Sequence, residues 1–196
     1  MTTQTTSRNL AFVLAALAAT PAAAHVGVGP VSGFAAGFTH PMFGADHFLA
    51  MIAVGLWSGL IGGRALWAWP LAFVAVMALG GVLGMAGVGL PFVEPAILAS
   101  VIVLGVVVAF AVKAPVSAGA IMVSVFALFH GHAHGTEVPV SAGGLDYLAG
   151  FAIATAILHG AGIALALGVT RFGLSTNVVR LLGAGIAVAG VAFATG

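Results

Sequence analysis

The sequence predicts an all-α membrane protein, a bundle of about six transmembrane helices, and three observations support this. Hydrophobic residues make up 62% of the chain and charged residues only 5%, whereas about 25% of the residues of a typical soluble domain are charged. The 29 glycines suit transmembrane helices, because small residues let their backbones approach closely. The apolar residues also gather in segments of about 20 residues, the length of helix that crosses about 30 Å of hydrocarbon.

Residues 1–24 are predicted to be a cleavable signal peptide. Arg8 is their only charged residue, an apolar stretch follows it, and Pro21 interrupts that stretch before the small residues Ala22–Ala24. Cleavage there would leave 25–196 as one polytopic transmembrane domain. The alternative is an uncleaved N-terminal helix. Both interpretations place the start of that domain outside the cytoplasm.

Six apolar segments follow, each near the length of a membrane-crossing helix. Glycine, proline and charged residues separate them. The first segment is long and contains Pro41, which lacks a backbone N–H, so we expect it to be tilted or kinked. The approximate bounds are 31–60, 66–86, 91–111, 116–135, 145–167 and 178–194.

The charged residues test this assignment of spans. With the domain starting outside, the connections after the first, third and fifth spans face the cytoplasm. They contain every basic residue of the mature chain: Arg64, Lys113, Arg171 and Arg180. Glu94, Glu137 and Asp146 lie at outer ends of spans, and Asp46 lies within the first. This distribution follows the positive-inside rule and predicts a multi-pass protein of the bacterial inner membrane with a periplasmic mature N-terminus.

The two halves of the domain, with three spans each, would have opposite orientations. This arrangement permits a 3+3 inverted repeat, an architecture common among transporters. Similarity between the halves is weak at the level of residues. The best indication is that the first span of each half carries a histidine-rich motif in its outer portion.

The first motif reads HPMFGADHFLAM and begins at His40. A charged Asp at a helix centre costs at least ~2.5–3.5 kcal/mol, so such groups usually face a partner, a cavity or an ion. On a straight helix His40 and His47 lie about 10 Å apart, but a break at Pro41 would bring them together. Asp46 is expected to bind the ion or to accept a hydrogen bond from an imidazole. Met51 is either a soft ligand or a core residue. The alternative for the motif is a set of polar groups that hold helices together.

The second motif, FHGHAHGTE, ends the fourth span. His130, His134 and Glu137 share one helix face, a geometry in which two imidazoles can bind one ion. The motif is not HExxH, which argues against a zinc protease. His132 points elsewhere, so we expect it to be solvated or interfacial. Without metal, His130 and His134 would be interfacial histidines and Glu137 a surface residue. The two motifs should lie at similar depth and form a joint site from His40, Asp46, His47, His130 and His134.

Of four further polar residues, three have two interpretations each. Glu94 is either a first-turn acid favoured by the helix dipole or a ligand at the entrance. His159, midway through the fifth span, is either a functional intramembrane residue or a packed neutral imidazole bonded to a neighbouring helix. After cleavage His25 would offer an amine and an imidazole as a chelating pair, or else belong to a disordered terminus. Asp146 is most simply a helix-start residue.

At these motifs the chain resembles the HupE/UreJ family of nickel/cobalt transporters. The family signature HPxxGxDHxxxM matches residues 40–51 at each specified position, and the pattern FHGxxHGxE matches residues 129–137. The resemblance covers essentially the whole chain. It implies a secondary permease that imports Ni²⁺, or sometimes Co²⁺, often for the maturation of hydrogenase or urease. It also implies that His40, Asp46 and His47 are the leading site residues, with His130, His134 and Glu137 next.

Composition limits the remaining function classes. The chain has no cysteine, so thiolate sites are excluded, and imidazole with carboxylate suits Ni, Co, Zn or Cu. Lys113 is the only lysine and follows Val112, so a Walker A motif is absent and a gradient, the membrane potential or a separate partner would drive transport. No permanently bound cofactor and no nucleic-acid partner are expected, and homo-oligomerisation stays open. The rival class is a membrane-embedded metal-dependent hydrolase, and a metal sensor or scaffold is a third.

Overall fold

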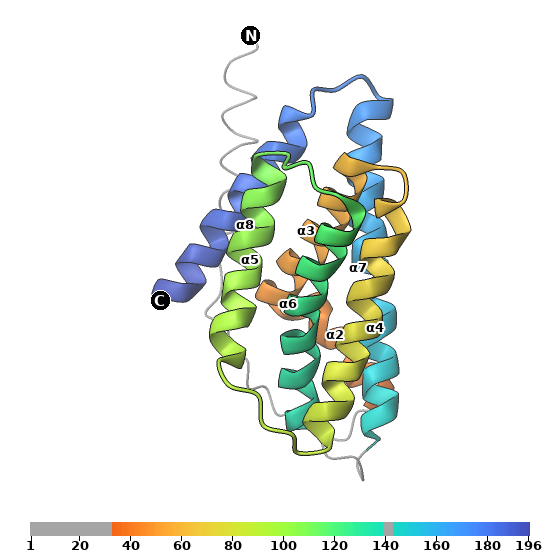
Figure 1. Cartoon of the computed structure of the whole chain (residues 1–196), viewed down its shortest axis with the longest axis vertical. Coiled ribbons are helices and arrows are strands. Elements are labelled where there is room, and N and C mark those ends of the chain that lie inside the picture. Colours follow the sequence, from red (N-terminus) through yellow and green to blue (C-terminus); the bar gives the residue numbers. More distant parts are fainter. Residues whose placement is uncertain (1–32, 139–142) are drawn as a thin grey trace.

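The structure is a computed structural model that describes residues 33–138 and 143–196. The predicted signal peptide and His25 lie outside the described residues. Within the described part the chain forms seven α-helices, most of which run along the long axis of the bundle (Figure 1). Their bounds are α2 Gly33–Phe43, α3 Ala45–Ile61, α4 Ala65–Met85, α5 Val93–Ala109, α6 Val116–Glu137, α7 Gly144–Arg171 and α8 Asn177–Thr195.

Helix length supports fewer membrane spans than the sequence predicts. In the described part, α4, α6, α7 and α8 are each long and apolar enough to cross a membrane, and α2 with α3 makes a fifth span if the bent pair counts as one. The third predicted span falls short, because α5 has 17 residues and a helix needs about 20 to cross the hydrocarbon core. It starts late because Phe92 adopts the left-handed conformation, with φ +61°, which an α-helix cannot continue.

The first predicted span is bent, as expected, but the position expected for the bend is wrong. Pro41 lies inside α2, and the helix breaks instead at Gly44, which has extended backbone angles of φ −74° and ψ 109°. The two helices meet there at 76°. Pro41 removes one backbone hydrogen bond near the end of α2, and the chain leaves the helix three residues later at Gly44, where a Cβ would lie only 3.2 Å from the carbonyl oxygen of His40.

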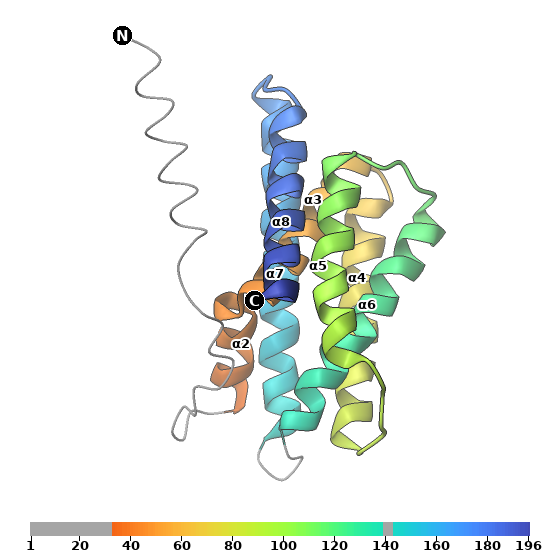
Figure 2. The same cartoon turned by 90° about the vertical axis from the view of Figure 1, so that its left-hand side faces the viewer.

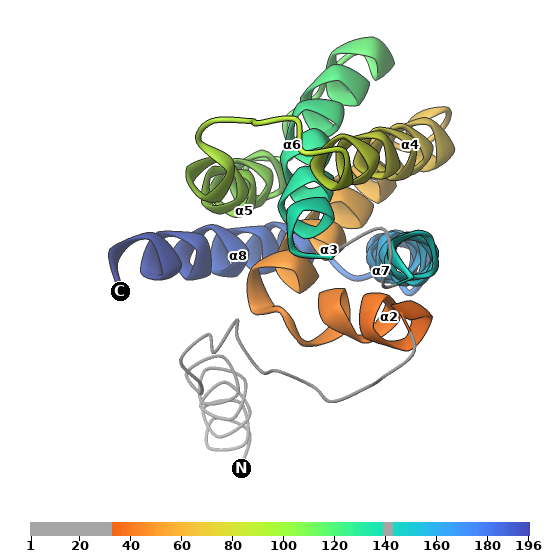
Figure 3. The same cartoon turned by 90° about the horizontal axis from the view of Figure 1, so that it is seen from below.

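Helices of the first half of the chain pack against helices of the second half. α3 runs parallel to α7, with Gly55 against His159 and Gly162, and α4 runs parallel to α6, with Gly131 against Met77. α5 packs antiparallel to α8 through Gly105 and other small residues. Seen from below, α5 and α8 lie at one side of the bundle and α7 with α2 at the other (Figure 3). At these glycines the backbones approach so closely that a side chain would collide.

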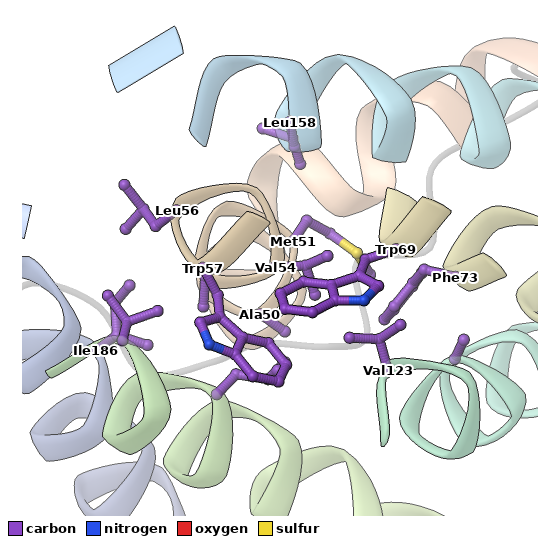
Figure 4. Packing of buried hydrophobic residues seen from close by; sticks show 14 of the residues in the cluster. Ala50, Met51, Val54, Leu56, Trp57, Trp69, Phe73, Val123, Leu158 and Ile186 are labelled. Atoms are coloured by element: carbon purple, nitrogen blue, oxygen red, sulfur yellow. The ribbon is translucent and has the colours of Figure 1, made fainter. Parts of the chain in front are cut away.

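The centre of the bundle is α3, whose residues are buried in an unbroken run from Ala53 to Ser58. Its Trp57 stacks against Trp69 of α4, with ring centroids 4.1 Å apart (Figure 4). The two indole N–H groups donate hydrogen bonds to the carbonyls of Val112 and Val116, both at 2.8 Å. A buried indole needs such a partner, so this pair fixes the connection between α5 and α6 to the core.

Charge separates the two ends of the bundle. The end we call the basic end contains the connections α3–α4, α5–α6 and α7–α8, and the opposite, acidic end contains the connection α4–α5 (Figures 1 and 2). The basic residues of the described part, all at the basic end, are Arg64, Lys113, Arg171 and Arg180. The acidic end contains Glu94, Glu137 and Asp146.

Candidate metal centre

Three imidazoles from three helices converge on one position. His40 comes from the last turn of α2, His47 from the first turn of α3 and His134 from the last turn of α6. One ring nitrogen of each lies within 4.8 Å of the corresponding nitrogens of the other two. The bend at Gly44 is what brings His40 to His47, with ring centroids 5.4 Å apart. We call these three residues the imidazole cluster.

Asp46 sets the orientation of His47. Its Oδ1 lies 2.7 Å from Nδ1 of His47 and also accepts the backbone N–H of His47 at 2.8 Å. An ionised carboxylate can only accept hydrogen bonds, so Nδ1 of His47 carries the proton and Nε2 presents its lone pair. Of the two roles expected for Asp46, the structure shows the hydrogen bond that orients a ligand and raises its basicity.

The lone pair of His47 faces His134. Their Nε2 atoms lie 2.6 Å apart, so one proton is shared between two nitrogens that could both bind an ion. Glu137 Oε2 lies 3.5 Å from Nδ1 of His134, although the side chain of Glu137 is 61% exposed. Two imidazoles bind one ion at about 2.0–2.1 Å each, so an ion that replaces the proton requires the rings to move apart slightly.

An aromatic wall from α7 encloses the imidazole cluster. The ring of Phe151 lies 4.9 Å from His134, 6.0 Å from His47 and 6.2 Å from His40, measured between centroids. Tyr147, one turn earlier, lies 6.4 Å from the rings of both His40 and His134. An apolar shell of this kind limits the access of solvent and tunes the ligands. Sequence analysis missed both residues, although their spacing of four on an apolar span was the available signal.

His130 lies behind the cluster and binds a different partner. Its ring meets that of His47 edge-on at 4.8 Å, and its Nε2 lies 2.9 Å from the hydroxyl of Ser100 on α5. The single proton of that hydroxyl is donated to the carbonyl of Ile97 at 2.6 Å. Ser100 must therefore accept from Nε2–H of His130, which leaves the lone pair on Nδ1, an atom without a partner among the described residues.

The other predicted residues lie outside the imidazole cluster. Glu94 is an exposed residue in the first turn of α5 and Asp146 in that of α7. Met51 is fully buried among apolar side chains (Figure 4). His132 is only 5% exposed and bonds the carbonyl of Val88 at 2.6 Å, so it is not solvated, and of the two expected roles only the interfacial one remains. The connection after α4 folds over it.

His159 is packed, but without the bond to a neighbouring helix that one interpretation required. It is 1% exposed, and its ring meets Phe73 of α4 edge-on at 5.1 Å and 84°. Neither of its ring nitrogens has a hydrogen-bond partner in the described part of the chain.

The arrangement can bind a divalent transition-metal ion. Three imidazoles supply nitrogen ligands, and the carboxylates of Asp46 and Glu137 supply negative charge 2.7 and 3.5 Å from ring nitrogens of the cluster. Imidazole suits Ni, Co, Zn and Cu, and geometry rather than ligand type selects among them. The five residues of the predicted joint site thus lie together, three around one position and Asp46 and His130 behind it.

Two comparisons with known proteins found matches over most of the chain. The sequence profile of the family described as HupE / UreJ protein matches residues 13–193. Protein HupE of Rhizobium leguminosarum bv. viciae is 51% identical over 185 residues, which cover 93% of this chain and 95% of that protein. No solved structure matches the chain.

Proposed function

The chain belongs to the HupE/UreJ family, and from this premise we propose that it is a secondary permease that imports Ni²⁺, or Co²⁺, across the cytoplasmic membrane. The family is associated with nickel transport, and its members are generally transporters rather than enzymes. The observation that carries the proposal is the buried imidazole cluster inside an apolar bundle. The imported metal would supply hydrogenase or urease maturation, as the family resemblance implies.

The distribution of charge supports a defined orientation. The basic end would face the cytoplasm, as the positive-inside rule asks, and the acidic end the periplasm. The imidazole cluster lies in the half of the bundle nearer the acidic end, beside the early turns of α7. In the proposed topology of six spans, α5 is the short third span and α2 with α3 the broken first. An ion arriving from the periplasm would reach the cluster first.

The helix pairing supports the 3+3 inverted repeat. A two-fold exchange of the halves maps the first span onto α6, α4 onto α7 and α5 onto α8. The parallel pair of α3 with α7 then corresponds to the parallel pair of α4 with α6, and the antiparallel pair of α5 with α8 maps onto itself. In transporters with such repeats the ion site lies between the repeats. Here His40 and His47 come from one half and His134 from the other.

The membrane potential alone could drive uptake. A divalent ion that enters a cell gains ~4.6 kcal/mol per 100 mV, twice the value for a single charge. Exchange of protons for metal is a second source, because imidazoles must be neutral to bind the ion. The described part of the chain offers no large loop or additional domain in which a substrate other than an ion could bind, which weighs against the rival membrane-embedded hydrolase.

Radiolabelled nickel uptake tests the proposal. Cells that lack their own nickel importers are expected to accumulate nickel in a saturable manner when they express the chain, and not when they carry an empty vector. Unlabelled cobalt competes if the site accepts both ions. The same membranes, assayed for metal-dependent hydrolysis, should show no added activity. Absence of nickel and cobalt uptake despite normal membrane expression would refute the permease.

Ser100 provides a second prediction, because its hydroxyl determines which nitrogen of His130 carries the proton. Ser100→Ala removes the acceptor for Nε2–H and is expected to weaken the apparent affinity of nickel uptake about tenfold, at the low end of losses seen when a residue that orients a ligand is removed. The measurement is the concentration dependence of nickel uptake by this variant, in which KM should rise while the maximal rate changes little.

The matched control is Ser58→Ala. Ser58 is also fully buried and also donates its hydroxyl to a backbone carbonyl, that of Val54 at 2.8 Å, but it forms no hydrogen bond with a histidine among the described residues. We expect uptake by this variant within about twofold of wild type, as for a site outside the binding machinery. Equal losses in both variants would show that Ser100 acts only through packing.

A further inference from the structure

A second group of donor side chains lies below the imidazole cluster, towards the basic end. His47, His134 and Phe151 lie at the cluster on α3, α6 and α7. One turn deeper on each of these helices stands a fully buried residue whose side chain has an atom able to bind a metal ion. Residues four apart lie one above the other on a helix, so these side chains lie on the same helix faces as the cluster, directly below it. They are Met51 on α3, His130 on α6 and Thr155 on α7.

His159 lies one turn deeper again on α7. It is 1% exposed, and both of its ring nitrogens lack a partner in the described structure. Desolvating a polar group without a hydrogen bond is costly, and such exceptions in native proteins call for an explanation in function. A phenylalanine would fill the same space without the cost of burying two unpaired nitrogens. The nitrogens of His159 therefore point to a ligand.

Thr155 and Met77 face each other one turn away from His159. α4 and α7 run antiparallel, so Met77 faces Thr155 while Phe73, one turn away, faces His159. The hydroxyl of Thr155 lies 3.6 Å from the sulfur of Met77, and both side chains are buried. A thioether and a hydroxyl thus face each other between the two helices, and the imidazole lies one turn deeper on α7. Phe73 lies in the same apolar core (Figure 4).

Resting on the proposed transport, we propose that His159, Met77 and Thr155 form a second binding position for the imported divalent ion. Eight residues separate His159 from Phe151 at the cluster, about 12 Å along α7. His130 connects the two positions, because its ring lies 4.8 Å from that of His47 and 5.9 Å from that of Phe73.

The chemistry of the two positions suits directional transfer. The cluster has two neighbouring carboxylates, whereas the deeper position has none among its three donors. Thioether and imidazole donors still suit a borderline transition-metal ion, but without a carboxylate they attract it less. Conduction requires sites that bind strongly enough for entry and weakly enough for release. The deeper position would take the ion from the cluster and release it towards the basic end.

Two substitutions test the position with little change of shape. His159→Phe keeps an aromatic ring against Phe73 and removes both nitrogens, and Met77→Leu removes the sulfur at similar volume. We expect nickel uptake to fall at least about tenfold in the first variant, as for the loss of a ligand-shell group, and less in the second. Purified wild-type protein should bind a second, weaker equivalent of nickel that both variants lose, while the tighter equivalent keeps its affinity.

The controls separate this inference from the transport proposal. Met122→Leu, on the part of α6 nearer the basic end, and Thr170→Val, whose exposed hydroxyl bonds only the carbonyl of Leu167 among the described residues, should behave as wild type. Wild-type uptake by His159→Phe would overturn the inference and leave the permease intact. If the wild type transports no metal, the permease fails, and the binding stoichiometry decides alone: loss of the second equivalent supports the position, and a single equivalent in wild type refutes it.

Discussion

Replacing His47 with alanine is expected to abolish nickel uptake, by more than about 100-fold, the upper range for loss of groups around a metal. His47 contacts both Asp46 and His134 and so joins the two sides of the site. Its Nδ1–H donates to the Asp46 carboxylate at 2.7 Å, and its Nε2 faces Nε2 of His134 at 2.6 Å. Its removal takes away one ligand and also leaves the half-buried Asp46 carboxylate without its imidazole partner, with only the backbone N–H of residue 47 to donate to it, which is costly in an apolar setting.

His132→Gln is the matched control for this substitution. His132 is as buried as His47, at 5% against 4% exposed, but it bonds the carbonyl of Val88 instead of joining the cluster. Glutamine can still donate to that carbonyl. We expect nickel uptake within about twofold of wild type, as for most changes away from a special feature. Both variants must reach the membrane in equal amount, and normal saturable uptake by His47→Ala would place the ion elsewhere.

The sequence identified the residues of the cluster but not the way in which they meet. The spacing of His40 and His47 on a straight helix separates them by about two turns, and a bend was needed to join them. Pro41 drew attention to the correct region, yet the bend lies at Gly44. A proline near the C-terminus of a helix removes only one hydrogen bond, and the chain leaves the helix three residues later, at Gly44, where a Cβ would lie only 3.2 Å from the carbonyl oxygen of His40.

Contacts between distant spans were beyond sequence reasoning. Ser100 is one of several unremarkable serines in the printed chain, and only the packing of α5 against α6 shows that it holds His130. The same holds for His132, which periodicity placed away from the site. Periodicity gives the face of a helix, but it does not give which neighbour covers that face, and the connection around Val88 covers this one.

The closeness of the helices is as much part of the site as the histidines. Gly131 lies between His130 and His132 and faces the backbone of Met77 on α4. Gly135, one turn later, faces the backbone of Gly81 in the same way. Helices in lipid associate through such close packing rather than through a hydrophobic driving force. The position of His134, between these turns, therefore depends on the seam between α4 and α6.

Gly131→Ala is expected to destabilise the protein by about 3 kcal/mol or more, the upper range for overpacking, with a fall in unfolding temperature on the order of 10 °C. The added Cβ would collide with the carbonyl oxygen of Met77 and approach the backbone nitrogen of Gly81. Backbone atoms cannot rotate away as a side chain can, so α4 and α6 must separate. Nickel uptake should fall as well, because His134 moves with α6. Thermal unfolding of the purified protein in detergent measures the first effect.

Gly160→Ala makes the same chemical change where it should help. Gly160 lies inside α7, and a Cβ there would meet no atom within 4 Å. Alanine in an exposed helix interior is more favourable than glycine by roughly 0.5–1 kcal/mol, so this variant should unfold at the same temperature or higher and keep its nickel uptake. The difference between the two variants therefore measures the close contact of Gly131 with the backbone of α4, separately from the general effect of replacing a glycine. If Gly131→Ala unfolded like Gly160→Ala, the close approach of α4 and α6 at the histidine motif would be wrong, and with it the position assigned to His134.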